Sequence, residues 1–197
     1  MCIRDRFISD VRQSADYTDI AVGRDVVVIG GGMTAIDAAV QAKLLGAEKV
    51  TIAYRRAQEN MNASRWEQEL ATSKGCVILP HLQPQSLSCD GGDGDVSEIT
   101  FEYTSSTADG LKGTGETITM AANQVLMAVG QTLEGAPDGP VVESGKIRVD
   151  DNGRTSVKGI WAGGDCASGG DDLTVTAVAE GRDAADDIHL QLTGNGA

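Results

Sequence analysis

A glycine-rich turn early in the chain has the residue types that hold a dinucleotide. It follows an apolar run at residues 26–29 and opens an alanine-rich segment. A helix that starts at such a turn offers unpaired N–H groups and a partial positive charge, and glycine lets the backbone approach a pyrophosphate closely. The spacing Gly-x-Gly-x-x-Ala after a strand favours binding over a tight turn that only packs a helix on a strand. The predicted contacts are Gly30, Gly31, Gly32, Met33, Thr34 and Ala35.

Two arginines follow the next apolar run, in the order Tyr54-Arg55-Arg56. An NAD-binding domain usually has an acidic residue here, about 20 residues after the glycine turn, to bond the ribose 2′-hydroxyl. A guanidinium group matches a 2′-phosphate, which a carboxylate would repel. Two solvated arginines at the end of a strand are the structural alternative. Together with the glycine turn, the pattern favours NADPH over NADH as the bound nucleotide.

A second glycine motif, Gly163-Gly164-Asp165, lies near the carboxyl end of the chain. A carboxylate held by glycines after a strand can bond a ribitol hydroxyl. The helix expected from about residue 173 can direct its N-terminal amides at a flavin. A carboxylate that only caps a helix produces the same pattern. The residues alone therefore leave flavin binding and helix capping as open alternatives.

The spacing of apolar residues predicts the elements that position the first two motifs. Residues 25–45 fit a strand, the glycine turn and a helix, and residues 50–54 fit a second strand. Residues 64–75 begin with a capping-box pattern and predict a second helix, followed by a third strand at 76–79. This β-α-β-α-β order predicts an α/β fold with a Rossmann-like, doubly wound parallel sheet.

The following segment has the pattern of antiparallel strands. Residues 90–95 and 109–115 are rich in turn-forming residues. Between and after these turns, residues 98–104 and 116–120 alternate enough to form strands of a small meander. Residues 124–130 then predict a buried strand closed by a glycine. We place a domain boundary close to Gly130.

The last third of the chain has its own order of elements. Residues 146–150 and 159–165 predict short strands, and residues 173–192 predict a long amphipathic helix. Its candidate inward positions are Val175, Val178, Ala179 and Ile188. We further expect Trp66 and Trp161 to pack in the interior, His81 and His189 to be structural, and Asp171, Asp172, Asp186 and Asp187 to be solvated.

Composition excludes several classes of partner. The chain has 197 residues and a formal net charge of −13, which repels nucleic acid and anionic membranes at long range. No apolar run approaches the roughly 20 residues that span a bilayer. The four cysteines include no Cys-x-x-Cys pair, so we expect reduced thiols, a cytoplasmic location and no metal site.

Several segments, in order, resemble the glutamate synthase small-subunit family, which includes the flavin half of dihydropyrimidine dehydrogenases. The resemblance covers nearly everything after Phe7. The similar segments are residues 30–39, 54–56 and 59–64 for the pyridine-nucleotide domain, residues 128–131 for the domain junction, and residues 159–166 and 173–182 for the C-terminal FAD motif.

The resemblance implies an NADPH-dependent flavoprotein oxidoreductase. In that family a hydride passes from nicotinamide C4 to flavin N5, and electrons leave through iron–sulfur clusters to a partner subunit or domain. Placement and electrostatics suffice for this reaction, so no side-chain acid or base is assigned. The resemblance also implies which residues contact the cofactors. Gly30, Gly32 and Ala35 would contact the pyrophosphate, and Arg55 and Arg56 the 2′-phosphate. Further cofactor contacts would come from Gly130, Gly164, Asp165, Leu173, Thr174 and Val175.

The sequence also departs from this family. Full-length members begin with a cysteine-rich cluster domain and a separate glycine motif for FAD, and neither occurs here. We therefore expect a C-terminal portion of such an enzyme, with its FAD site completed by an N-terminal region or another chain. The predicted domains are a connecting segment at 1–22, whose first residues we exclude from the fold, a NAD(P)H-binding domain at 23–130, and the C-terminal part of a FAD-binding domain at 131–197.

Three alternatives stay open. A thioredoxin-reductase-like disulfide oxidoreductase has the same two-dinucleotide design, although the missing dithiol argues against it. A nucleotide-binding module without independent turnover is the second alternative. The third is a regulatory or scaffold subunit that completes its FAD site with another chain. No residue in the sequence identifies the final electron acceptor.

Overall fold

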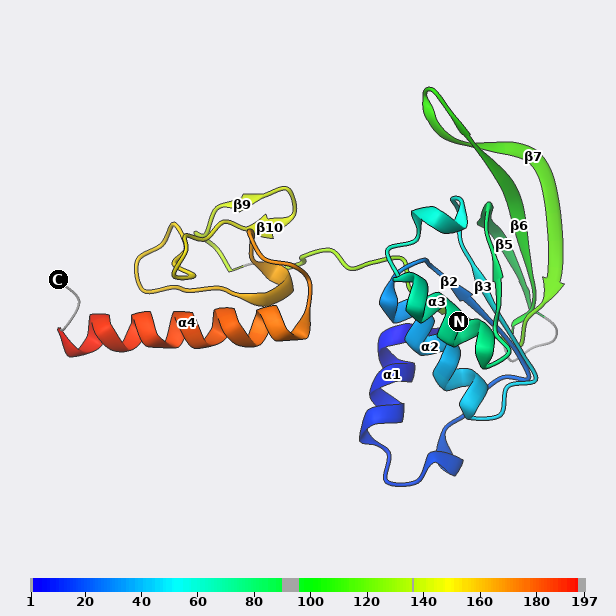
Figure 1. The fold of residues 1–197 in the computed structure, drawn as a ribbon, viewed down its shortest axis with the longest axis horizontal. Helices are drawn as coiled ribbons and strands as arrows, with labels where there is room; N and C mark the ends of the chain where they lie inside the picture. Colours follow the sequence, from blue (N-terminus) through cyan, green and yellow to red (C-terminus); the bar gives the residue numbers. More distant parts are fainter. Residues whose placement is uncertain (1, 90–95, 136, 195–197) are drawn as a thin grey trace. The chain divides into compact units, whose positions relative to one another are not determined.

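Figure 1 shows the computed structural model, in which residues 2–89, 96–135 and 137–194 are described. Contacts along the backbone divide the chain into two compact units, residues 1–130 and 131–197. Each unit has its own secondary structure.

A five-stranded parallel sheet forms the centre of the first unit, with the strand order β1-β8-β2-β3-β4. Its strands are β1 (Cys2–Ile3), β2 (Asp25–Ile29), β3 (Lys49–Ala53), β4 (Val77–Leu79) and β8 (Gln124–Met127). The helices are α1 (Arg4–Gln13), α2 (Met33–Leu44) and α3 (Arg65–Ser73), with short 3₁₀ turns at Tyr17–Asp19 and Gln58–Asn60. Because α2 joins β2 to β3 and α3 joins β3 to β4, the predicted β-α-β-α-β order is confirmed.

The start of α3 is fixed by the predicted capping box. The hydroxyl of Ser64 accepts a hydrogen bond from the backbone N–H of Glu67, and the Glu67 carboxylate accepts one from the backbone N–H of Ser64. Each bond satisfies a donor that the helix itself leaves unpaired. The helix ends before Gly75, whose φ of +86° is in the left-handed region.

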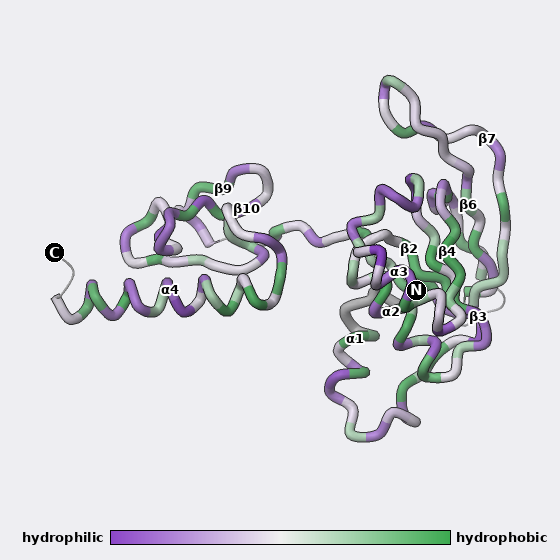
Figure 2. The backbone as a smooth tube through the Cα atoms, viewed as in Figure 1, coloured by the Kyte–Doolittle hydropathy of each residue, from purple (hydrophilic) through white to green (hydrophobic). Residues whose placement is uncertain are grey.

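The two faces of the parallel sheet are covered differently. Since successive side chains of a strand point to opposite faces, Val26 and Val28 of β2 lie in a core shared with α1, α2 and α3. Val27 and Ile29 lie in a second core, shared with an antiparallel sheet. Hydrophobic residues accordingly concentrate along the central strands (Figure 2). The predicted parallel sheet thus has helices on one face and an antiparallel sheet on the other.

The antiparallel sheet consists of β5 (Leu82–Cys89), β6 (Val96–Thr107) and β7 (Gly110–Ala121), in that order. The predicted meander is present, but two details differ. β5 was not expected, and the segment predicted as a turn at 109–115 lies almost entirely in β7, paired with β6. The predicted turn at 90–95 lies outside the described residues.

The N-terminal segment belongs to the fold, contrary to the expectation of a connecting segment at 1–22. β1 pairs in parallel with β8 at the edge of the sheet, and α1 follows it directly. Phe7 of α1 is only 2% exposed and is part of the helix-side core. The sequence pattern did not predict that α1 packs in this core, because only one large apolar side chain of α1 is fully buried.

The second unit contains little regular sheet. β9 (Val142–Glu143) and β10 (Lys146–Ile147) form a two-stranded antiparallel pair, so the strand predicted at 146–150 ends early. The segment at 159–165 forms no strand, contrary to the prediction. Within the described residues its only ladder pairing is one bridge from Trp161, and a strand requires a continuous partner.

The unit ends in a 3₁₀ turn at Gly164–Cys166 and the long helix α4 (Thr174–Thr193) (Figure 1). α4 is confirmed, but its inward face differs from the prediction. Val175 and Val178 are 75% and 69% exposed, whereas the other two predicted positions, Ala179 and Ile188, are half-buried. Ala184 and Asp187, which were not predicted to face inward, are buried. No helix within the described residues is both long and apolar enough to cross a lipid bilayer.

Buried Asp187 ties α4 to the preceding loop. Its carboxylate accepts two hydrogen bonds from the guanidinium group of Arg154, at 2.7 and 2.5 Å, and one from Trp161 Nε1 at 2.8 Å. The expectation that Asp187 is solvated is therefore wrong. The expectation for Trp66 is wrong as well, because its side chain is 69% exposed on α3.

Candidate functional site

The glycine turn lies at the carboxyl end of β2, and its first two glycines are fixed by close contacts. Gly30 donates its N–H to the Ala53 carbonyl at 3.0 Å and has a φ of +149°. A Cβ atom there would lie 2.2 Å from the Ala128 carbonyl oxygen. At Gly31 a Cβ atom would lie 2.5 Å from the ring of Tyr54. These two positions exclude a side chain because protein atoms already fill the space.

The third glycine, Gly32, is different. It is the N-cap residue of α2, its φ of −96° suits any residue, and no side chain caps the helix there. A Cβ atom at Gly32 would meet no other atom within 4 Å. The open space lies where the N–H groups of the first helical turn have no intrahelical partners, a position suited to an anionic group.

The other residues predicted in this turn occupy different surroundings. Met33 is 40% exposed, and Thr34 lines the pocket described below. Ala35, by contrast, is completely buried in the helix-side core. Its small side chain therefore lets α2 pack closely on the sheet, which is the role of the third fingerprint position.

The arginine segment, residues 54–56, begins at the carboxyl end of β3. The Tyr54 N–H donates to the Leu79 carbonyl at 3.0 Å, and the Tyr54 hydroxyl donates to the Asn60 carbonyl at 2.8 Å. The tyrosine thus connects the arginine segment to the loop after it, while its ring covers Gly31. Arg55 and Arg56 are exposed.

One pocket of about 510 Å³ joins these segments. The carboxyl ends of β2, β3 and β8 meet there, at the point where the sheet order changes direction along the chain, which is where open α/β sheets bind ligands. Among the described residues that line it, the charged ones are Arg55 and Arg56, and none is acidic. The lining is Ile29, Gly30, Gly31, Gly32, Thr34, Ala53, Tyr54, Arg55, Arg56, Asn62, Leu82, Gln83, Pro84, Ala128, Val129 and Gly130.

Part of this lining was not predicted. Asn62 follows the arginine segment, and Leu82, Gln83 and Pro84 open the unexpected strand β5. Asn62 belongs to the segment 59–64 that resembles the family, although it was not named as a contact. No sequence signal marks Leu82, Gln83 and Pro84, because tertiary packing brings them to the pocket. Gly130, which was predicted, follows β8 and has a φ of +105°.

The residues predicted to contact FAD lie in the second unit. Asp165 is exposed in the 3₁₀ turn, and Leu173 is the N-cap of α4 without a capping side chain. Thr174 and Val175 are exposed in the first turn of α4, so their surroundings are open to a ligand. Asp165 does not cap α4, which removes the helix-capping alternative for this carboxylate.

Gly164 has a structural role within the unit. Its N–H donates to the Glu180 carboxylate at 2.6 Å, and a Cβ atom there would lie 3.2 Å from the Ala177 Cβ. The glycine, with a φ of +72°, therefore allows the turn to pack against α4. Its N–H is already paired with a carboxylate.

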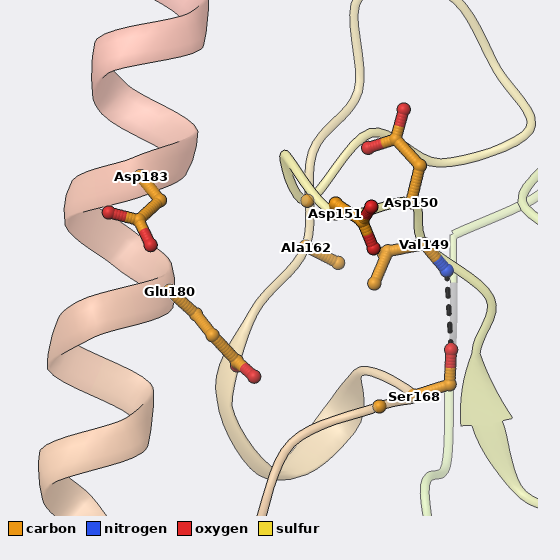
Figure 3. Close-up of a pocket in the computed structure, with 9 residues that line it drawn as sticks. Val149, Asp150, Asp151, Ala162, Ser168, Glu180 and Asp183 are labelled. Carbon is orange, nitrogen blue, oxygen red and sulfur yellow. Dashed lines mark hydrogen bonds between the residues drawn. The ribbon is translucent and has the colours of Figure 1, made fainter.

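A second pocket, of about 270 Å³, lies between α4 and the loop at 149–153. Figure 3 shows Glu180 extending from α4 toward the loop that carries Asp150 and Asp151, and Asp183 of α4 also lines the pocket. Four carboxylates disfavour a phosphate group here. No group of three or more His, Cys, Asp or Glu side chains in the described part of the chain is placed to hold a metal ion.

The described cysteine side chains form no redox pair. Cys76, Cys89 and Cys166 are free thiols. Burial raises the pKa of the Cys76 thiol, with a smaller opposing effect of Lys43, so this group is protonated and unreactive at neutral pH. These thiols offer no support for dithiol chemistry.

Comparison with known proteins identifies the family. The chain matches the family model of pyridine nucleotide-disulphide oxidoreductases over residues 4–181. It is 36% identical over 182 residues to the glutamate synthase [NADPH] small chain of Escherichia coli (strain K12), covering 84% of this chain and 38% of that protein. It is 29% identical over 188 residues to the NAD-dependent dihydropyrimidine dehydrogenase subunit PreT of the same strain, covering 95% and 41%. The chain thus spans less than half the length of these relatives.

Solved structures share the fold. The thioredoxin reductase of Lactococcus lactis aligns with a TM-score of 0.74 at 24% sequence identity, over 92% of this chain and 55% of that one. The thioredoxin reductase of T. acidophilum aligns with a TM-score of 0.71 at 22% identity, over 91% and 54%. The expected resemblance to glutamate synthase small subunits and dihydropyrimidine dehydrogenases is confirmed by the sequence relatives. The chain belongs to the pyridine nucleotide-disulphide oxidoreductase family.

Proposed function

We propose that the first unit binds NADPH and serves as the electron-donor site of a flavoprotein oxidoreductase. The observation that carries this proposal is the meeting of the glycine turn with Arg55 and Arg56 in one pocket that has no acidic lining residue among those described. The open space at Gly32 fits the pyrophosphate. The arginines fit the 2′-phosphate, which distinguishes NADPH from NADH.

Electrostatics support this choice of nucleotide. The whole chain has a formal net charge of −13, yet the charged residues of the pocket lining are two arginines. A 2′-phosphate placed between exposed guanidinium groups gains charge-assisted hydrogen bonds. An NADH-specific site would place a carboxylate at the end of β3, and that position is Tyr54-Arg55-Arg56 here.

We propose further that residues 131–197 provide part of a FAD site. The exposed Asp165 and the uncapped N-terminus of α4 at Thr174 and Val175 are suited to a ribitol hydroxyl and to the electron-rich edge of a flavin. FAD, when bound, supplies the hydride acceptor and releases the electrons onward. The residues of this chain orient the two nucleotides, and a partner subunit or another part of the protein completes the site.

Binding measurements with the full chain test the nucleotide preference. Calorimetric titration is expected to show tighter binding of NADPH than of NADH. Arg55→Ala and Arg56→Ala are each expected to lower NADPH affinity by about 10- to 100-fold, the equivalent of losing one charge-assisted hydrogen bond. Affinity for NADH is expected to stay within about twofold, because NADH has no 2′-phosphate.

Arg65→Ala is the matched control, since Arg65 lies on α3, is exposed and pairs with Glu69 outside the pocket. Equal binding of NADPH and NADH by the unaltered chain contradicts the proposed phosphate contact.

An absorbance spectrum of the chain with added FAD tests the proposed flavin site and separates two outcomes. A bound flavin that NADPH bleaches supports hydride transfer, while nucleotide binding without it supports a binding module lacking independent turnover.

A further inference from the structure

The antiparallel sheet holds the arginine segment by its main chain. Three consecutive carbonyl oxygens of that segment each accept a hydrogen bond, from His81 just before β5, from Leu82 at the start of β5 and from Thr104 within β6. The bonds are Leu82 N–H to the Tyr54 carbonyl at 2.9 Å, Thr104 Oγ1 to the Arg55 carbonyl at 2.6 Å, and His81 N–H to the Arg56 carbonyl at 3.1 Å. The backbone that carries both guanidinium groups is therefore fixed at every residue.

Thr104 is the one of these three donors that uses a side chain, and an irregularity of β6 directs it inward. Ile99 and Phe101 are buried, so strict alternation would bury Tyr103 next. The register with β7 shifts between Glu102 and Thr104. As a result Tyr103 is 37% exposed and Thr104 only 5% exposed. Such bulges re-aim side chains next to functional sites.

The neighbouring His81 strengthens the same link. Its φ of +61° is unusual for a residue with a side chain. This conformation lets its N–H donate to the Arg56 carbonyl while its own carbonyl accepts the N–H of Thr104 at 2.9 Å. Thr104 is thus bonded to the arginine segment both directly and through His81. A locally strained backbone held by its surroundings is typical of a functional segment.

We propose that Thr104 is a positioning residue for the specificity of this site toward a 2′-phosphorylated dinucleotide. The inference rests on the proposed NADPH function of the pocket. Thr104 is not among the described residues that line the pocket, so it acts through Arg55. Its hydroxyl fixes the Arg55 carbonyl, and the guanidinium groups then extend from a fixed backbone toward the phosphate. Pre-organised arginines lose less freedom on binding.

The test compares two nucleotides that differ by one phosphate. Thr104→Val keeps the shape of the side chain and removes the hydroxyl, which leaves the partly buried Arg55 carbonyl unpaired. NADPH affinity of the full chain, measured by calorimetry, is expected to fall about tenfold, the effect of one lost hydrogen bond. NADH affinity is expected to change less than about twofold, because the glycine turn is untouched. Thr104→Ser, which restores the hydroxyl, is expected to recover NADPH affinity.

Thr100→Val is the matched control. Thr100 lies on the same strand, and its hydroxyl pairs with that of Thr119 at 2.8 Å, away from the arginine segment. The Thr100→Val substitution also removes a hydroxyl from β6, and it is expected to leave the affinities for NADPH and NADH unchanged. Thr104→Ala provides the same comparison should Thr104→Val not fold, as judged by circular dichroism.

The outcomes distinguish failure of the positioning role of Thr104 from failure of the proposed NADPH function. Equal losses of NADPH and NADH affinity in the Thr104 variants assign Thr104 a purely structural role and overturn the inference. Unchanged NADPH affinity in Thr104→Val, together with a loss in Arg55→Ala, overturns the inference and leaves the proposed function standing. Absence of NADPH binding by the unaltered chain overturns both.

Discussion

The three glycines of the turn after β2 have three different surroundings. Gly30 has a positive φ and lies against the Ala128 carbonyl, and Gly31 lies under the ring of Tyr54. Both glycines are explained by the fold of the unit itself. A Cβ atom at Gly32 would meet no other atom within 4 Å, so the fold does not require glycine there, whereas the proposed pyrophosphate contact would.

This difference predicts separate effects on stability and binding. Gly32→Ala places a methyl group in open space at an N-cap position, where alanine is less favourable than glycine. Its free energy of unfolding, from urea denaturation, is expected to fall by less than about 1 kcal/mol. Its NADPH affinity is expected to fall by about tenfold or more, because the methyl group keeps the pyrophosphate from the helix amides.

Gly30→Ala is the contrasting variant. Its methyl group would lie 2.2 Å from a backbone oxygen, at a φ of +149°, so the strand ends must shift. Unfolding is expected to become easier by about 1–3 kcal/mol or more. A Gly32→Ala protein that binds NADPH normally would contradict the proposed position of the pyrophosphate.

At the scale of elements, α1 contributes directly to the stability of the first unit. Phe7→Ala removes a buried ring from the helix-side core, and such substitutions cost about 3–5 kcal/mol. Urea denaturation is expected to show a loss of this size. Gln13→Ala, an exposed change in the same helix, is expected to have an effect within about 0.5 kcal/mol. Similar small effects for both variants would show that α1 does not pack on the unit.

We expect the contact between Asp187 of α4 and Arg154 to be sensitive to acid. The hydrogen-bonded Arg154 guanidinium lowers the pKa of Asp187, with a smaller contribution from Trp161 Nε1, so its folded-state pKa lies below the unfolded value of about 3.9. The stability from this pair is complete above the unfolded pKa and is lost as the pH falls through the folded one. We therefore expect the contact between Asp187 and Arg154 to weaken progressively as the pH falls below the unfolded pKa of about 3.9.

Tryptophan fluorescence reports this change directly. The sequence contains two tryptophans, so Trp66→Phe leaves Trp161 as the reporter. Its emission is expected to shift to longer wavelength as the pH falls from about 4 to about 2. Asp187→Asn is expected to show the shifted emission already at neutral pH, while Asp186→Asn, its exposed neighbour, is expected to behave like the parent protein. A signal independent of pH in the parent would argue against the Asp187 contact.

Elements with strong local signals were predictable from the sequence. β2, α2, β3, α3 and β4 follow from apolar periodicity, the glycine turn and the capping box at Ser64. β5 was missed because it begins with one buried leucine and continues through Gln83 and Pro84, which have low strand propensity. The strand predicted at 159–165 was wrong for the opposite reason, because this segment has a strand-like composition but no continuous partner strand.

The same distinction applies to the pocket. The glycine turn and the arginine segment lie next to strong local signals, so their residues could be named in advance. Thr104 could not, because its inward direction depends on a bulge in β6 and on contact with a segment 49 residues earlier. Asp187 was misassigned for a similar reason, since its partner Arg154 lies 33 residues away.

For the whole molecule, charge predicts an unusual effect of salt on binding. A net charge of −13 repels the anionic NADPH at long range, whereas the two arginines attract it at short range. The Debye length falls from about 30 Å at 0.01 M salt to about 8 Å at 0.15 M, which screens the repulsion first. We expect the association rate constant for NADPH, from stopped-flow fluorescence, to rise over this range.

NADH is the internal control for the salt experiment. It has a smaller negative charge than NADPH, so its association rate is expected to rise less. A rate for NADPH that falls with added salt would instead show that the arginine pocket dominates the long-range field. The dissociation rate, which reports the short-range contacts, is expected to increase modestly with salt for NADPH.

The hydrogen bonds that hold the main chain of the arginine segment have a consequence for which side chains the segment can carry. All three tethering bonds end on carbonyl oxygens, which every amino acid possesses. The identity of the side chains at 55 and 56 is therefore uncoupled from the folding of the loop. An acidic residue could replace an arginine there and remain in the same place, turned toward a ribose hydroxyl. On the proposed function, we therefore expect coenzyme choice to change with one or two codons, without rebuilding the domain.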